Sequence, residues 1–402
     1  MITDHKLVLF GAGKIGRSFI GQLFSNGGYE IVFIDVYKAV IDELNRRHEY
    51  KVVIKADKDE ILNIKNVRGV YAEDEKKVVQ EIVSANILAV SVGQNGLGLV
   101  VSLLAKGLQE RYNQHNTSCL DIIIAENLRN GADYFFRELK KQLPSTYPID
   151  QLLGLVETSI GKMVPIMLKR DIQEDILQVF AEPYNTLIVD KKAFKNPIPD
   201  ISGLAPKNNI KAWVDRKLFI HNLGHAATAY LGYMYNPSFV YLYEALAVPD
   251  VYKQVRETVE QAAAILVKKY PDEFTLQSLT DHMDDLLVRF QNKALGDTLF
   301  RVGSDLKRKL GPEDRITGAI KLAREVHQPY GKILYALVCG CHFRQVNEDG
   351  NRLVADIEFS KHYAKGLRNI LTKTCGFDEI KDLRIIEEAE KMDVDLVLGM
   401  HG

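Results

Sequence analysis

Short apolar runs alternate with amphipathic stretches through the first half of the chain. The runs have the length of buried strands, which we expect at residues 6–10, 30–35, 51–55, 61–67, 86–92, 121–125, 151–156, 176–180 and 186–189. Between them, apolar residues recur every three or four positions, which predicts helices at residues 15–24, 39–47, 75–83, 99–112 and 134–142. This alternation is typical of a parallel sheet with helices on its faces.

The pattern changes at a segment rich in proline and glycine. Pro197, Pro199, Gly203 and Pro206 fall between residues 196 and 209, and such residues interrupt regular elements. Beyond this segment helical periodicity dominates, at residues 211–235, 249–269, 276–290, 316–326, 333–343 and 354–371. We therefore expect an α/β domain of the Rossmann type over residues 1–205 and an all-α domain over residues 206–402.

The composition is that of an ordinary globular protein. Hydrophobic residues make up 46% of the 402 positions, and a net charge of −1 gives no support for binding nucleic acid or an anionic membrane. No apolar run approaches the length of a membrane span, and the N-terminus lacks the order of a signal peptide. Four cysteines are too few for a disulfide scaffold. We expect a cytoplasmic protein.

The first predicted strand runs into a glycine-rich turn, Gly11-Ala12-Gly13-Lys14-Ile15-Gly16, which a predicted helix follows. This is the G-x-G-x-x-G spacing of dinucleotide-binding folds. In such a turn Gly11 permits the tight bend, Gly13 lets the backbone approach a pyrophosphate, and Gly16 lets the helix pack closely on the strand. The N-terminus of the helix then offers N–H groups to the phosphates.

Two further residues complete the predicted cofactor site. Asp35 ends the second predicted strand, 19 residues beyond Gly16, where its carboxylate would bind the ribose hydroxyls and repel a 2′-phosphate. The sequence therefore predicts NAD rather than NADP. Val92, at the end of a later strand, is expected beside the same crevice. The alternative, a glycine turn that only packs a βαβ unit, is disfavoured by this combination of strand, turn, helix and acidic residue.

A second group of polar residues lies in the helical half. Lys217, Asn222 and His225 stand at offsets of zero, five and eight, which correspond to roughly 0°, 140° and 80° on an α-helix. One helix face can therefore carry all three. A base, an amide and an imidazole on one face are suited to a hydroxyl group that must lose a proton. Taken alone, Lys217 also fits a solvent-facing lysine and His225 a core histidine.

Several ordered segments carry a resemblance to a known family. They are residues 10–21, 33–36, 123–127, 188–190, 216–226 and 342–344. In these segments the chain resembles the polyol-specific long-chain dehydrogenases, most closely the members that act on mannitol 1-phosphate. The resemblance implies an enzyme that uses NAD, and no metal, to interconvert a sugar alcohol and a ketose, with mannitol 1-phosphate and fructose 6-phosphate as the expected pair. It allows either a monomer or a homodimer.

The resemblance also implies roles for individual residues. Lys217 would be the general base for alcohol oxidation and the acid for ketone reduction, so its pocket must lower a pKa that is ordinarily near ~10.4. Asn222 and Asn127 would donate hydrogen bonds to the reacting oxygen as an oxyanion hole. His225 would orient a substrate hydroxyl. Asn127 has a structural alternative, which is to cap the chain after its strand.

The chain departs from the family at two places. Gly161-Lys162 stands where these enzymes usually carry Asp-Arg, and Ser304 stands near an expected arginine. The pattern fits either the loss of an ion pair that grips the substrate or a local shift of the alignment. We expect Lys162 to provide a single positive charge for a phosphate or carboxylate of the substrate.

These departures leave other functions open. A hexuronate reductase of the same family, acting on fructuronate or tagaturonate, would keep the mechanism and change the substrate. A dehydrogenase of the 6-phosphogluconate type is disfavoured, because it uses a tighter lysine–asparagine spacing. A sensor that binds NAD without catalysis would not need the intact polar residues. Cys339-Gly340-Cys341-His342 lacks a second group of metal ligands, so we interpret its cysteines as buried thiols.

Overall fold

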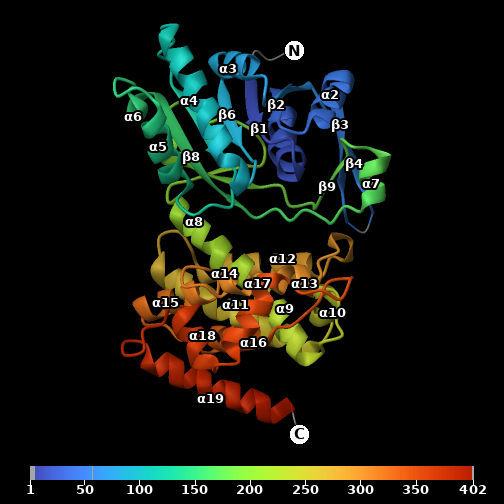
Figure 1. Cartoon of the computed structure of the whole chain (residues 1–402), viewed down its shortest axis with the longest axis vertical. Coiled ribbons are helices and arrows are strands. Elements are labelled where there is room, and N and C mark those ends of the chain that lie inside the picture. The colour runs from blue at the N-terminus through green and yellow to red at the C-terminus, as the bar shows by residue number, and fades with distance from the viewer. Residues whose placement is uncertain (1–4, 57, 401–402) are drawn as a thin grey trace. The chain divides into compact units, whose positions relative to one another are not determined.

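The computed structural model describes residues 5–56 and 58–400. The chain divides into two compact units, Met1–Val214 and Asp215–Gly402 (Figure 1). The sequence predicts a domain boundary after residue 205, and this position lies within the first unit. Each unit has its own secondary structure and is described separately.

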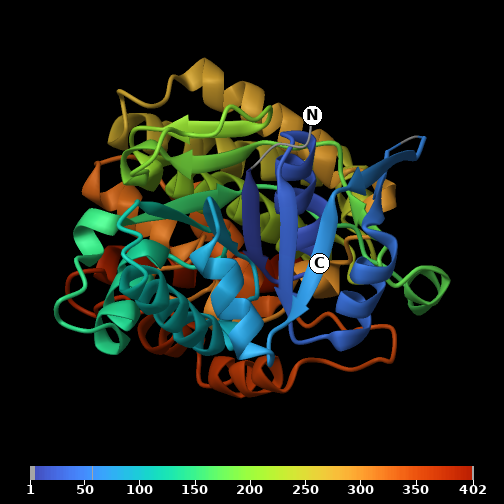
Figure 2. The ribbon, with the colours of Figure 1, turned by 90° about the horizontal axis from the view of Figure 1, so that it is seen from above.

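The first unit is built on an eight-stranded sheet with the order β11-β10-β8-β7-β6-β1-β2-β5. Its strands are β1 (Lys6–Phe10), β2 (Glu30–Asp35), β5 (Val67–Tyr71), β6 (Ile87–Val90), β7 (Leu120–Ile124), β8 (Leu153–Ile160), β10 (Leu187–Asp190) and β11 (Leu204–Lys207). Neighbouring strands are parallel except for β8 and β10. In Figure 2 the blue strands β1 and β2 run side by side. The expected parallel sheet is confirmed.

Helices cover both faces of this sheet. The helical elements of this unit are the π-helical η1 (Gly16–Gly21), α1 (Gln22–Asn26), α2 (Lys38–Arg47), α3 (Glu75–Val83), α4 (Leu97–Asn113), α5 (Gly131–Gln142), α6 (Ile149–Leu152) and α7 (Lys169–Glu174), with short 3₁₀ turns η2 (Gln94–Gly96) and η3 (Lys191–Ala193). Successive side chains of β1 enter different cores: Leu7 and Leu9 pack with η1 and α2, while Val8 and Phe10 pack with α3 and α4. Burial on both faces explains why β1 is apolar throughout.

The position of β1 determines where a ligand can bind. From β1 the strand order runs through β2 to β5 on one side and through β6 and β7 to β8 on the other. The loops that follow β1 and β6 therefore diverge at the carboxyl ends of these strands. In open α/β sheets, this topological switch point is where ligands bind.

A small second sheet accompanies the first. It has the order β4-β3-β9, formed by β3 (Glu49–Ile54), β4 (Glu60–Lys65) and β9 (Val179–Ala181). The single strand predicted at residues 61–67 is wrong, because Asn66, with φ of 57°, separates β4 from β5. β5 joins the main sheet beside β2. No strand was expected at β11, which contains Pro206 and pairs with β10.

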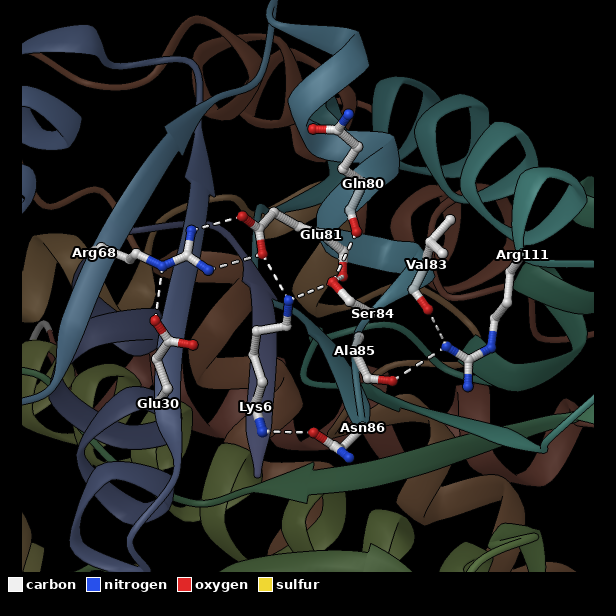
Figure 3. Close-up of polar contacts among 10 residues, drawn as sticks. All are labelled: Lys6, Glu30, Arg68, Gln80, Glu81, Val83, Ser84, Ala85, Asn86 and Arg111. Carbon is white, nitrogen blue, oxygen red and sulfur yellow. Dashed lines mark hydrogen bonds and ion pairs between the residues drawn. The ribbon is translucent and has the colours of Figure 1, made fainter. Parts of the chain in front are cut away.

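The amino ends of the strands carry a polar network (Figure 3). The Lys6 ammonium lies 2.8 Å from the Glu81 carboxylate of α3, and Arg68 of β5 contacts both Glu81 and Glu30. Each partner belongs to a different element, so the network fixes α3 to β1, β2 and β5. It lies at the opposite end of β1 from the glycine-rich turn and serves the fold.

The second unit is helical. Its elements are α8 (Ile210–Arg216), which begins in the first unit, η4 (Lys217–Asn222), α9 (Leu223–Tyr235), α10 (Leu242–Leu246), α11 (Pro249–Lys269), α12 (Leu276–Phe290), the 3₁₀ turn η5 (Lys293–Leu295), α13 (Leu299–Gly303), α14 (Leu306–Lys309), α15 (Thr317–Glu325), α16 (Gly331–His342), α17 (Val354–Tyr363), α18 (Leu367–Lys373) and α19 (Leu383–Met400). The helix predicted at residues 354–371 is interrupted at Gly366, whose φ is 99°. The expected helical domain is confirmed.

The central helix of this unit is α9. It is apolar around most of its circumference and buried from Leu223 to Gly232 except at His225, as expected of a helix surrounded by others. At Gly224 an added methyl group would lie 2.8 Å from Val259 of α11, so glycine permits the two helices to approach closely. None of the helices within the described residues is both long and apolar enough to span a bilayer.

Candidate active site

The glycine-rich turn is tightly folded at Gly11 and Gly16 and is exposed at Gly13 and Lys14. Gly11 has φ of 101°, and a methyl group there would lie 2.1 Å from the Ser91 carbonyl oxygen. A methyl group on Gly16 would lie 2.0 Å from the Gly11 carbonyl oxygen. At Gly13, by contrast, an added methyl group would meet nothing within 4 Å. The turn thus leaves space over Gly13 for a pyrophosphate, which fits NAD.

Asp35 is held against this turn. Its Oδ2 accepts a hydrogen bond from the Ala12 N–H at 2.6 Å, and its Oδ1 accepts one from the Tyr37 N–H at 2.8 Å. Each oxygen keeps a further lone pair, so the carboxylate can still accept ribose hydroxyls. Because the Ala12 N–H is already bonded to Asp35, Ala12 contributes to the site by fixing this carboxylate. Lys14 is exposed and Ile15 half-buried in the first helical turn after Gly13.

The loop after β6 lies beside the turn. The Val92 side chain would be 3.3 Å from a methyl group on Gly11, which places Val92 next to the predicted crevice. Its N–H donates to Glu126 Oε1 at 2.6 Å, and the Gly93 N–H donates to the same oxygen at 2.9 Å. Burial raises the pKa of Glu126, and these two bonds oppose the rise. Glu126 could not be predicted from the sequence, because its partners are more than thirty residues away.

Asn127 follows Glu126 on the loop between β7 and α5. Asn127 is exposed. Hydrogen bonds hold its loop at both ends. Glu126 anchors the start of the loop, and the Gly131 N–H at its end donates to Glu157 Oε1 of β8 at 3.0 Å. The role of Asn127 as a hydrogen-bond donor to substrate stays a prediction.

Lys217 and Asn222 lie at the two ends of the π-helical segment η4. The Leu223 N–H reaches the Leu218 carbonyl, an i→i+5 hydrogen bond that widens the turn. Residues five apart therefore come nearly into line, as residues four apart do in an α-helix. The 140° separation expected for Lys217 and Asn222 on an α-helix is therefore wrong. The π-helical turn makes the angle between them smaller, which favours a shared face.

The surroundings of Lys217 alter its acidity. Burial lowers the pKa of Lys217 to about 8, with further lowering by Arg315 and Arg308 and an opposing effect of Asp314. A lysine with this pKa exchanges protons near neutral pH, as a general acid and base must. Part of the lowering comes from residues almost a hundred positions along the chain, which no local motif reveals.

His225 is held by two residues, Asp297 and Phe290, that no sequence motif indicated. Its Nε2 lies 2.9 Å from Asp297 Oδ2, and its ring stacks on Phe290 with centroids 4.7 Å apart. Asp297 is also bound by Arg301. Burial, together with Arg301 and Lys309, holds the pKa of His225 well below its usual range. A neutral imidazole that donates from Nε2 to Asp297 keeps Nδ1 as an acceptor for a hydroxyl group.

Four basic side chains, Arg301, Arg308, Lys309 and Arg315, form what we call the basic cluster. The Lys309 ammonium donates to the Val302 carbonyl at 2.6 Å, and burial, with Arg315 and Arg308, lowers its pKa to about 7. Arg301 lies in α13 just before the buried Ser304, so an arginine is present near the position where the family pattern places one.

Lys162 lies in the first unit, where it is 6% exposed. Its ammonium donates to Asn185 Oδ1 at 2.7 Å, has Gln22 Oε1 at 3.5 Å, and lies 5.1 Å from the centre of the Phe19 ring. These contacts join η1 to the loop before β10. The predicted contact of Lys162 with an anionic substrate stays a prediction.

The cysteine-rich segment is part of the helical core. Cys339 and Cys341 are buried in α16, as expected, and His342 Nε2 lies 2.6 Å from Asp393 Oδ1. Burial raises the pKa of Cys339 to about 12. These thiols are therefore protonated and unreactive at neutral pH.

Comparison with known proteins identifies the family. Residues 5–203 match the mannitol dehydrogenase Rossmann domain, and residues 209–389 match the mannitol dehydrogenase C-terminal domain. The fold is similar to that of Pseudomonas fluorescens mannitol 2-dehydrogenase in a ternary complex with NAD and D-mannitol (TM-score 0.75, 15% identity, 98% of this chain and 92% of that one). It is also similar to a substrate-free D-sorbitol dehydrogenase (TM-score 0.79, 16% identity, 98% and 94%). The chain belongs to the mannitol dehydrogenase family of NAD-dependent polyol dehydrogenases.

Proposed function

We propose that this dehydrogenase interconverts mannitol 1-phosphate and fructose 6-phosphate, with Lys217 as the general base and acid. The observation that carries the mechanism is the placement of Lys217 and Asn222 at the two ends of one π-helical turn, where burial lowers the pKa of Lys217 to about 8. An ordinary lysine would be almost fully protonated at neutral pH and could not accept a proton from an alcohol. Lys217 can both accept and return one.

The remaining polar residues have complementary tasks in this proposal. During oxidation the Lys217 amine takes the hydroxyl proton, while the amides of Asn222 and Asn127 donate to the oxygen as negative charge develops on it. When bound, NAD supplies the acceptor for the hydride that leaves the carbinol carbon. The neutral His225, fixed by Asp297 and Phe290, accepts a hydrogen bond from a neighbouring substrate hydroxyl.

The basic cluster supports an anionic substrate. Within the described residues its three arginines pair with Asp297, Asp305 and Asp314, so protonation of Lys309 adds a positive charge in excess of these carboxylates. Lys309 is largely buried and has carbonyl oxygens as its hydrogen-bond partners. A phosphate would relieve this excess and favour the charged form of Lys309.

A parallel assay tests the substrate. Purified enzyme is given NADH with fructose 6-phosphate, fructose, fructuronate or tagaturonate, and NADH oxidation is followed by absorbance. We expect the highest kcat/KM with fructose 6-phosphate, and loss of turnover in Lys217→Ala with NADH binding retained. Turnover that survives intact in Lys217→Ala would refute the assigned base.

A hexuronate reductase is the second candidate, because the basic cluster would also accept a carboxylate. Preference for fructuronate or tagaturonate in the same assay would establish it and retain the mechanism. Tight NADH binding with no turnover on any of the four ketoses would instead indicate a sensor. Replacing Lys162 by alanine tests its predicted role, since an unchanged KM for the best anionic substrate would rule it out.

A further inference from the structure

Three loops meet at the carboxyl end of the central sheet. One is the glycine-rich turn after β1, the second contains Ser91, Val92 and Gly93 after β6, and the third contains Glu126 and Asn127 after β7. The first two are in direct contact, because the Ser91 carbonyl oxygen occupies the space beside Gly11. What connects the third loop to the second is a side chain.

That side chain is Glu126. A single oxygen, Oε1, accepts both the Val92 N–H at 2.6 Å and the Gly93 N–H at 2.9 Å. Gly93 has φ of 75°, a conformation that glycine adopts without strain, and its N–H and that of Val92 converge on this oxygen. Two N–H groups that converge on one carboxylate oxygen form charge-assisted hydrogen bonds, which are stronger than neutral ones.

We propose that Glu126 is a positioning residue that holds the Val92–Gly93 loop and Asn127 in a fixed relation at the cofactor crevice. Its side chain fixes the loop beside the glycine-rich turn, and its backbone carries the adjacent Asn127. As far as Asn127 is concerned, the inference rests on the proposed function. The bond from Gly131 to Glu157 holds the far end of the same loop, so removing Glu126 releases only its start.

Amide hydrogen exchange tests the anchoring directly. In Glu126→Ala we expect the peptide that contains residues 91–94 to exchange about tenfold faster, because two amides lose their acceptor. Glu126→Gln keeps an oxygen that can accept the same bonds without the charge, so its exchange rate should lie between those of the wild type and Glu126→Ala. Glu60→Ala, which removes an exposed carboxylate at the start of β4, is the matched control. Unchanged exchange in Glu126→Ala, or equal acceleration in the glutamine variant, would overturn the anchoring.

A double-mutant cycle tests the connection to Asn127. If Glu126 acts through Asn127, the losses of kcat in Glu126→Ala and Asn127→Ala will be less than multiplicative in the double variant. Fully multiplicative losses would overturn this connection. If Asn127→Ala leaves kcat unchanged, the role proposed for Asn127, and with it the catalytic part of this inference, fails. The exchange experiment then still decides whether Glu126 anchors the loop.

Discussion

Lys217 differs from an ordinary surface lysine because burial and two arginines make its ammonium form costly. If the amine carries the proton transfer, Lys217→Met should lower kcat by about 10²–10⁴-fold, the usual contribution of a positioned general base. Methionine keeps a similar length and apolar stem, so NADH affinity should stay near that of the wild type. Fluorescence titration of NADH provides that control, and a kcat within a factor of a few of wild type would contradict the role.

Together with burial, Arg315 lowers the pKa of Lys217. Arg315 is 8% exposed, and Asp314 accepts a hydrogen bond from its guanidinium, so its position is fixed. In Arg315→Met the loss of a like charge should raise the pKa of Lys217, moving the rise of oxidation rate with pH upward by roughly 0.5–1 pH unit. Arg384→Met, at an exposed arginine of α19, should leave the profile in place. An unmoved profile in Arg315→Met would show that Arg315 does not act on Lys217.

At the scale of elements, glycine has two different functions in the glycine-rich turn. Gly16→Ala forces a methyl group against the Gly11 carbonyl oxygen, so we expect a loss of about 1–3 kcal/mol in unfolding free energy together with weaker NADH binding. Gly13→Ala meets no protein atom and should fold normally, yet its methyl group would enter the space predicted for the pyrophosphate. Its Kd for NADH should rise by about tenfold or more, a loss of about 1.4 kcal/mol. Thermal unfolding and NADH titration of both variants test these two predictions. An equal loss of stability in Gly13→Ala and Gly16→Ala would contradict them.

The sequence predicts an element well when nearby residues determine it, and poorly when distant contacts do. Hydrophobic periodicity located α3, α11 and α12 with the bounds that the structure shows, because each is a single amphipathic helix with clear ends. It could not show that Lys217–Asn222 is a π-turn, since that is a change of hydrogen bonding within a continuous helix. β11 was missed because its strand character comes from pairing with β10, in a segment whose prolines indicate a break. Asp297 and Glu126 could not be assigned for the same reason: their partners are distant in sequence.

At the scale of the whole molecule, charge is nearly balanced. With a net charge of −1, the protein has no strong overall field to attract an anion, and any attraction must come from a local group such as the basic cluster. Raising salt from about 0.05 to 0.5 M should therefore lower kcat/KM for fructose 6-phosphate several-fold and leave that for unphosphorylated fructose almost unchanged. Steady-state kinetics with both ketoses measure this. Equal salt effects on the two would contradict a role for the basic cluster in binding phosphate.

The central claim is that one lysine with a pKa near 8 serves both directions of the reaction. Measuring kcat/KM against pH for oxidation of mannitol 1-phosphate by NAD and for reduction of fructose 6-phosphate by NADH tests it most directly. Oxidation needs the neutral amine, so its rate should rise through about pH 8, whereas reduction needs the ammonium form and should fall over the same range. Both limbs should vanish in Lys217→Met. Limbs that persist in this variant, or that lie far from pH 8 in the wild type, would contradict the account.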